Sequence, residues 1–278
     1  MNLSPKNLFQ KTFALTSAIA ATATLAPLSA QAATFSSSNA AVTINNFSVE
    51  PVQADAFTDA VTNTVAFEGS VDATANADAT FTGSSAFNTT DSTVQGQGLV
   101  YSGDAASFAQ VAGFFILNPG SVFSYNFTVA LDLTVKANEP QDNASAFGNV
   151  LFELFDNASG ELIDQFGVTG ELFATSNKFT PWNPFNYIPS DFVEVTDFSS
   201  DINFDGTTTN AKTEISGIYS RQFGSPITLR LQETKLTGAR AEAVPEPSEI
   251  VGTMIAGSLL FVGLRRRSRL RKEAQISI

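Results

Sequence analysis

One short acidic run, Asp201-Ile202-Asn203-Phe204-Asp205-Gly206, is a candidate site for binding a metal ion. This run matches the opening of a D-x-[DN]-x-[DN]-G calcium loop, in which alternate oxygen side chains converge on one ion. The twelfth position is Lys212 and not a glutamate, which excludes an EF-hand. Two interpretations remain: a calcium-stabilised loop of a β domain, with Asp201, Asn203 and Asp205 as ligands, or a plain turn.

A second candidate is the aromatic segment PWNPFNY at residues 181–187, which holds the only tryptophan of the chain. Its prolines favour an extended backbone. Aromatic rings pack well against the C–H faces of sugars, so Trp182, Phe185 and Tyr187 could form a ligand surface for a glycan. The alternative is a long loop that folds its rings back onto the edge of the domain.

Carboxylate pairs offer a third kind of chemistry, because glycoside hydrolases use two Asp or Glu residues. Glu153 with Asp156 and Asp191 with Glu194 have suitable spacings. However, such spacings arise by chance among so many acids, and nothing in the sequence marks one pair. The chain has no Cys and no His, which excludes disulfides, thiolate zinc sites and Ser-His-Asp catalysis. We therefore predict no catalytic residue and no cofactor other than a structural calcium ion.

Net charge limits the partners of the chain. Residues 33–244 hold 7 Lys or Arg against 24 Asp or Glu, a net charge of −17, while the whole chain carries −12. So acidic a region repels phosphate backbones and anionic lipids, which argues against nucleic-acid binding and peripheral membrane attachment. Solubility, cation binding or contact with neutral or bridged polysaccharide fits this charge better.

The sequence pattern around these candidate residues indicates β-strands. In residues 121–136, SVFSYNFTVALDLTVK, seven apolar residues from Phe123 to Val135 alternate with polar or small residues. This period of two is typical of a half-buried β-strand. Shorter pieces of the same kind, among them Ile227–Leu231, are separated by turn residues such as Asn118-Pro119-Gly120. The pattern predicts an all-β fold, an antiparallel β-sandwich of the jelly-roll type.

The N-terminus is typical of a secretory signal peptide. Lys6 and Lys11 precede an apolar stretch, and Ala30-Gln31-Ala32 is a small-x-small cleavage site. We therefore predict that residues 1–32 are removed on export and that residues 33–243 form the exported domain.

The C-terminus combines a short apolar span with a basic tail. Ile250–Leu264 is uncharged and, as a helix, would reach about 22 Å across a hydrocarbon core of about 30 Å. Arg265, Arg266 and Arg267 follow at once and would stay cytoplasmic as a stop-transfer signal. Pro245 and Pro247 cannot continue a helix, so they predict an extended, accessible segment just outside the inner membrane.

The order Pro245-Glu246-Pro247, apolar span, arginine cluster resembles the PEP-CTERM sorting signal of exported proteins in Gram-negative bacteria and cyanobacteria. The resemblance covers residues 244–273 only. It implies handling by an exosortase-type processing enzyme, a transient anchor in the inner membrane, and later association with the cell surface or with exopolysaccharide. An ordinary single-pass anchor with a proline-containing linker is the alternative.

Taken together, these features predict an exported, non-catalytic surface or matrix protein that is sorted by its C-terminal signal. The alternative from a different class is an exported enzyme that acts on polysaccharide through a carboxylate pair.

Overall fold

The computed structural model describes residues 34–138, 142–175, 178–179 and 183–243. The predicted signal peptide at 1–32, the predicted sorting segment at 244–273 with its apolar span, and Trp182 all lie outside the described residues. Within the described ranges there is no helix of the length and apolarity needed to cross a membrane.

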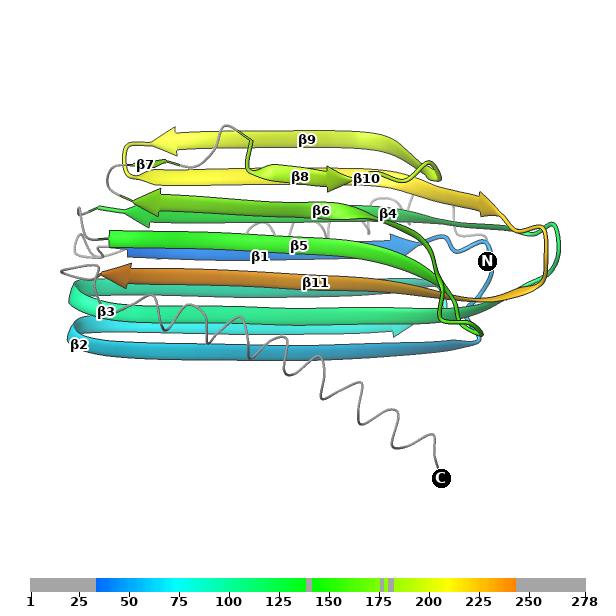
Figure 1. Ribbon diagram of the computed structural model, residues 1–278, viewed down its shortest axis with the longest axis horizontal. Coiled ribbons are helices and arrows are strands. Elements are labelled where there is room, and N and C mark those ends of the chain that lie inside the picture. The colour runs from blue at the N-terminus through cyan, green and yellow to red at the C-terminus, as the bar shows by residue number, and fades with distance from the viewer. Residues whose placement is uncertain (1–33, 139–141, 176–177, 180–182, 244–278) are drawn as a thin grey trace, which may run out of the picture. The chain divides into compact units, whose positions relative to one another are not determined.

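The described chain is built from strands, and all the pairings between them are antiparallel (Figure 1). The predicted all-β, antiparallel class is therefore confirmed. The strands are β1 (Thr34–Asn45), β2 (Gln53–Thr82), β3 (Ser85–Leu117), β4 (Val122–Ala137), β5 (Asp142–Asp156), β6 (Leu162–Thr175), β7 (Lys178–Phe179), β8 (Phe185–Ile188), β9 (Val193–Asp205), β10 (Thr208–Gln222) and β11 (Ile227–Ala243).

These strands belong to one 11-stranded sheet with the order β7-β6-β5-β11-β3-β1-β4-β10-β9. Strand β2 pairs with the other edge of β3, and β8 pairs with β6. The order does not follow the sequence, because the last strand, β11, lies between β3 and β5. The long segment 54–88, whose apolar pattern is less regular than that of later strands, falls in β2 and the start of β3.

The sheet turns a corner within β3. Residues 85–96 of this strand pair with β1, whereas residues 101–117 pair with β11. Strand β2 follows β3 around the corner and shifts register between Ala66 and Gly69. Gly98 has φ of 120°, and a Cβ atom at this position would lie 2.4 Å from the carbonyl oxygen of Glu68. Only glycine tolerates this conformation and this close approach, so the corner depends on it.

Because of this corner, two arms of the sheet face each other. β1 contacts β11 and β5, and β4 contacts β5 and β6, although none of these pairs is hydrogen-bonded along the sheet. We call the β1-β4-β10-β9 side, with residues 85–96 of β3, the first arm. The β11-β5-β6 side, with residues 101–117 of β3, is the second arm.

The core lies between the arms and is rich in rings. In β4 the seven alternating apolar residues from Phe123 to Val135 are all buried, as the sequence pattern predicts. Phe123 lies 4.7 Å from Phe115 of β3, and Phe152 of β5 stacks on Phe166 of β6 at 4.5 Å, measured between ring centroids. The predicted inward face of this strand is therefore confirmed.

The first and last described strands begin and end at the same end of the domain. Thr34 is opposite Gly96 and Ala137, and Ala243 is opposite Tyr101 and Asp142. The hydroxyl groups of Thr34 and Tyr101 are hydrogen-bonded to each other.

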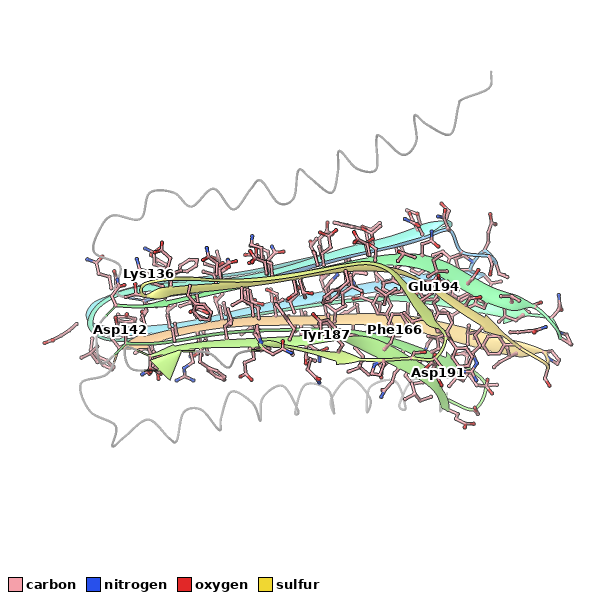
Figure 2. The ribbon with its side chains drawn as sticks, turned by 90° about the horizontal axis from the view of Figure 1, so that it is seen from above. Lys136, Asp142, Phe166, Tyr187, Asp191 and Glu194 are labelled. Atoms are coloured by element: carbon pink, nitrogen blue, oxygen red, sulfur yellow. The ribbon has the colours of Figure 1, made fainter. Side chains whose placement is uncertain are left out.

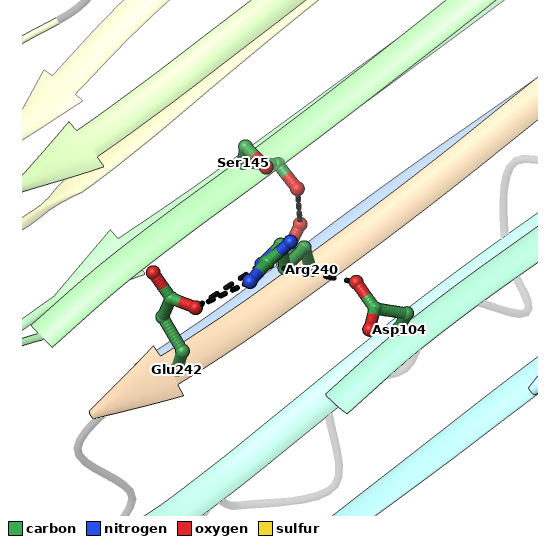
Figure 3. Close-up of polar contacts among 5 residues, drawn as sticks. Asp104, Ser145, Arg240 and Glu242 are labelled. Atoms are coloured by element: carbon green, nitrogen blue, oxygen red, sulfur yellow. Dashed lines mark hydrogen bonds and ion pairs between the residues drawn. The ribbon is translucent and has the colours of Figure 1, made fainter. Parts of the chain in front are cut away.

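Polar contacts join the strands near this end (Figure 3). Arg240 of β11 donates to Glu242 at 2.6 Å and lies 3.8 Å from the carboxylate of Asp104 in β3. The hydroxyl of Ser36 in β1 donates to the carbonyl oxygen of Ser145 in β5, which links the first arm to the second. Both chain ends of the domain are thus held at one place.

Candidate functional site

A cavity of about 230 Å³ opens at the side of the core opposite the β2–β3 corner. There the second arm ends in β6 and β8, and the first arm ends in β10 and β9. Nearly all of its lining is apolar, which is typical of small-molecule sites. The lining residues are Phe127, Val129, Phe152, Phe166, Gly167, Val168, Tyr187, Ile188, Pro189, Ser190, Val193, Val195, Phe198 and Ile215.

Two groups of rings form the walls of this pocket. Phe127, Phe152 and Phe166 form the inner wall, with Phe127 at 5.4 Å and 5.1 Å from the other two ring centroids. Tyr187 and Phe198 meet edge to face at 5.4 Å, with an angle of 74° between their planes. Phe198 is 51% exposed, so this second pair forms the part of the wall that a ligand in solution can reach.

The loop between β8 and β9 shapes the rim of the pocket. Strand β8 ends at Ile188, directly before Pro189, which has no N–H for continued pairing. Ser190 then fastens the loop, because its hydroxyl accepts from the N–H of Phe192 and donates to Asp164 of β6 at 2.7 Å. The position of this rim is therefore fixed by contacts with the neighbouring strand.

A few polar side chains lie near the apolar pocket. The hydroxyl of Tyr187 is hydrogen-bonded to that of Thr213 in β10, at 3.0 Å. Arg221 lies over the ring of Phe192 at 4.4 Å and donates to the carbonyl oxygen of Ile163 at 3.0 Å. Among the residues that line the pocket, Tyr187 and Ser190 supply hydroxyl groups beside the apolar rings, whereas Arg221 does not line it.

The structure places the predicted aromatic surface differently. Phe185 is buried in the core, 3% exposed, and so does not belong to an open ring surface. It fits there because it pairs with Gly170 of β6, where a Cβ atom would lie 2.8 Å from the Phe185 ring. Tyr187 does line the pocket, while Trp182 lies outside the described residues. The partner of Tyr187 is Phe198, which the sequence did not single out.

The predicted calcium ligands lie in a strand and not in a loop. Asp201, Asn203 and Asp205 occupy alternate positions of β9, so they lie on one face of it, and the first and last are about 13 Å apart along an extended strand. In this arrangement their oxygens do not converge on one point. No cluster of three or more acidic side chains suited to a metal ion occurs in the described part of the chain. Calcium binding stays a prediction.

Neither carboxylate pair named from the sequence resembles a catalytic dyad in its surroundings. Glu153 accepts a hydrogen bond from the amide of Gln232 at 3.1 Å, and Asp156 accepts from the N–H of Ala158 in the following turn. Asp191 and Glu194 are exposed, at the end of the strands away from Lys136 and Asp142 (Figure 2).

Comparison with known proteins identifies no relative from which a function could be transferred. No protein-family model matches the chain, and no match was found among curated proteins or solved structures.

Proposed function

We propose that the chain is an exported, non-catalytic cell-surface or matrix protein whose β domain binds a polysaccharide at the pocket between β8 and β9. The observation that carries this proposal is the ring pair Tyr187–Phe198 at the mouth of an apolar cavity with a polar rim. Exposed aromatic rings beside the hydroxyl groups of Tyr187 and Ser190 suit a sugar, which has apolar faces and hydroxyl edges. The two facing arms would then be the layers of a jelly-roll-like β-sandwich.

The placement of the pocket supports a role at a surface. Thr34 and Ala243 lie together at one end of the strands, whereas the pocket rim at Ser190 lies toward the other end, near the turn after β10. If the chain is anchored through the segment after Ala243, the rim points away from the anchor. The net charge of the exported region would keep it soluble and apart from anionic lipids.

For the C-terminus we propose a PEP-CTERM sorting signal at Pro245-Glu246-Pro247, with an exosortase-type enzyme as processing partner and the arginines from Arg265 to Arg267 as the stop-transfer signal. This proposal is supported by the sequence pattern alone. Mass spectrometry of the mature protein tests it, because peptides that cover Arg271–Ile278 on the surface-located form would refute processing.

The binding proposal is tested by co-sedimentation of the protein with the exopolysaccharide of its host. Phe198→Ala should weaken binding about tenfold or more, because truncating an aromatic anchor residue costs about 1.4 kcal/mol or more of binding free energy. Phe204→Ala is the matched control, because Phe204 lies on the same strand, is 54% exposed, and does not line the pocket. Equal binding by both variants would refute the assigned site.

An enzyme that acts on polysaccharide is the alternative of a different class. The same incubation separates the two, because an enzyme would release new reducing ends and a binding protein would only sediment with its ligand.

A further inference from the structure

Ionisable side chains occur in the interior of the domain, outside the residues that line the pocket. Glu233 and Lys235 of β11 are both fully buried, at 0% exposure. They project between the arms because they share the inward face of β11 with Leu229 and Leu231. Along β11 they lie between the large aromatic core and a smaller buried cluster of Val94, Ala105, Ala239 and Ala241.

Asn88 of β3 completes this buried group. The ammonium or amine nitrogen of Lys235 donates to the backbone oxygen of Asn88 at 2.7 Å. The side-chain amide of Asn88 donates to Oε2 of Glu233, and Oε1 of Glu233 lies 3.8 Å from Nζ of Lys235. One carboxylate thus contacts both an amine and a carboxamide. The remaining oxygen of the carboxamide, Oδ1 of Asn88, is buried and has no hydrogen-bond partner.

Burial favours the uncharged forms of the acid and the amine. Desolvation lowers the pKa of Lys235 to about 8, against the opposing effect of Glu233. Desolvation also raises the pKa of Glu233, although Lys235 and Asn88 act in the other direction. Both shifts act toward moving one proton from the ammonium to the carboxylate, which leaves two neutral groups in a buried environment. A neutral amine is a nucleophile, whereas an ammonium group is not.

We propose that Lys235 and Asn88 form an intramolecular isopeptide bond, with Glu233 as the group that carries the proton. Nζ of Lys235 attacks Cγ of Asn88, a C–N bond forms, and the bond from Cγ to Nδ2 breaks. Glu233, which holds the proton taken from the ammonium, delivers it to Nδ2 and takes one from Nζ, so ammonia leaves and Glu233 returns to its neutral state. The reaction needs no oxidant, reductant or cofactor.

The bond would join the two arms across the core. Asn88 lies on the first arm, opposite Val42 of β1, and Lys235 lies on the second, opposite Val150 of β5. The two residues are 147 positions apart in sequence. Exported proteins often use disulfides for such long-range links, and this chain has no cysteine. An amide link would serve the same purpose and would resist reduction.

The test is the intact mass of the folded full-length chain, with its termini established by peptide mapping. We expect the mass to be lower than the sequence value by one ammonia molecule. Digestion should yield a branched peptide that joins the segments containing Asn88 and Lys235. A folded protein with the full sequence mass would overturn the proposal, as would a mass loss that maps to other residues.

Variants separate the role of each group. Asn88→Asp should lose one water molecule in place of ammonia and give the same linked product. Lys235→Gln should show no mass loss, and Glu233→Gln should show none or a strongly slowed one, although both linked residues are intact. Lys212→Gln is the matched control, because Lys212 is an exposed lysine paired with Asp132, and this variant should lose ammonia as the wild type does. A mass loss that persists in Lys235→Gln would contradict the assignment.

Discussion

The stability of the ring-rich core can be tested at Phe123, whose side chain is fully buried. Its ring centroid lies 4.7 Å from that of Phe115, 5.7 Å from that of Tyr125 and 6.5 Å from that of Tyr219. Phe123→Ala removes about 1.5–3 kcal/mol of transfer free energy. It also leaves a cavity, because these large rings, held on strands of both arms, cannot collapse into the space. The expected total is about 3–5 kcal/mol.

Thermal denaturation followed by circular dichroism measures this loss. For a domain of this size, 1 kcal/mol corresponds to roughly 2–4 °C, so the midpoint should fall by about 6–20 °C. Phe204→Ala makes the same chemical change on the edge strand β9, where the ring is 54% exposed, and should cost less than about 1 kcal/mol. Equal losses in the two variants would mean that the facing arms do not enclose Phe123 as described.

Three further predictions concern the corner, an interior acid and the C-terminal motif. Gly98→Ala should cost about 1–3 kcal/mol or more, because φ is 120° there, whereas Gly224→Ala, which has open space around it, should be nearly neutral in urea titrations. Burial raises the pKa of Asp91 in the folded state, so the folded state gains stability from this group as the pH falls from 7 toward the unfolded pKa near 3.8. Asp91→Asn should therefore raise the midpoint of thermal unfolding at pH 7 and make that midpoint less dependent on pH. A lower midpoint at pH 7 would contradict this. Replacing Pro245 and Pro247 by Ala should leave export intact and let an unprocessed form accumulate in the inner membrane, visible as a heavier band in membrane fractions; unchanged processing would favour the plain anchor.

Strand β4 could be predicted from the sequence, because both of its neighbours are strands of the same arm and its inner face is apolar throughout. Strand β11 could be predicted only in part. The sequence pattern indicates Ile227–Leu231, whereas the strand continues to Ala243, since Glu233 and Lys235 occupy inward positions that a simple apolar pattern assigns to solvent. Their burial depends on Asn88, which is distant in sequence.

The candidate site was also less predictable, because it depends on contacts between residues that are distant in sequence. Phe185 is buried because Gly170 on a neighbouring strand leaves room for its ring, which no local pattern indicates. Asp201 and Asp205 have the spacing of a loop motif, but pairing with β10 holds them in an extended strand. The corner in β3 depends on which distant strands pair with its two halves. Tyr187 could be selected from its local sequence, whereas its contact with Phe198 required the fold.

The position of β11 determines how the domain carries a mechanical load. The strand is 17 residues long, ends at Ala243, and is hydrogen-bonded to β3 on one side and β5 on the other. If the chain is tethered after Ala243 and holds a ligand near Ser190, as proposed, a pull between the two acts along the strand axis. Hydrogen bonds on both sides are then strained together in shear, whereas an edge strand would be unzipped one bond at a time. A chain pulled through this strand should therefore resist unfolding from its attached end.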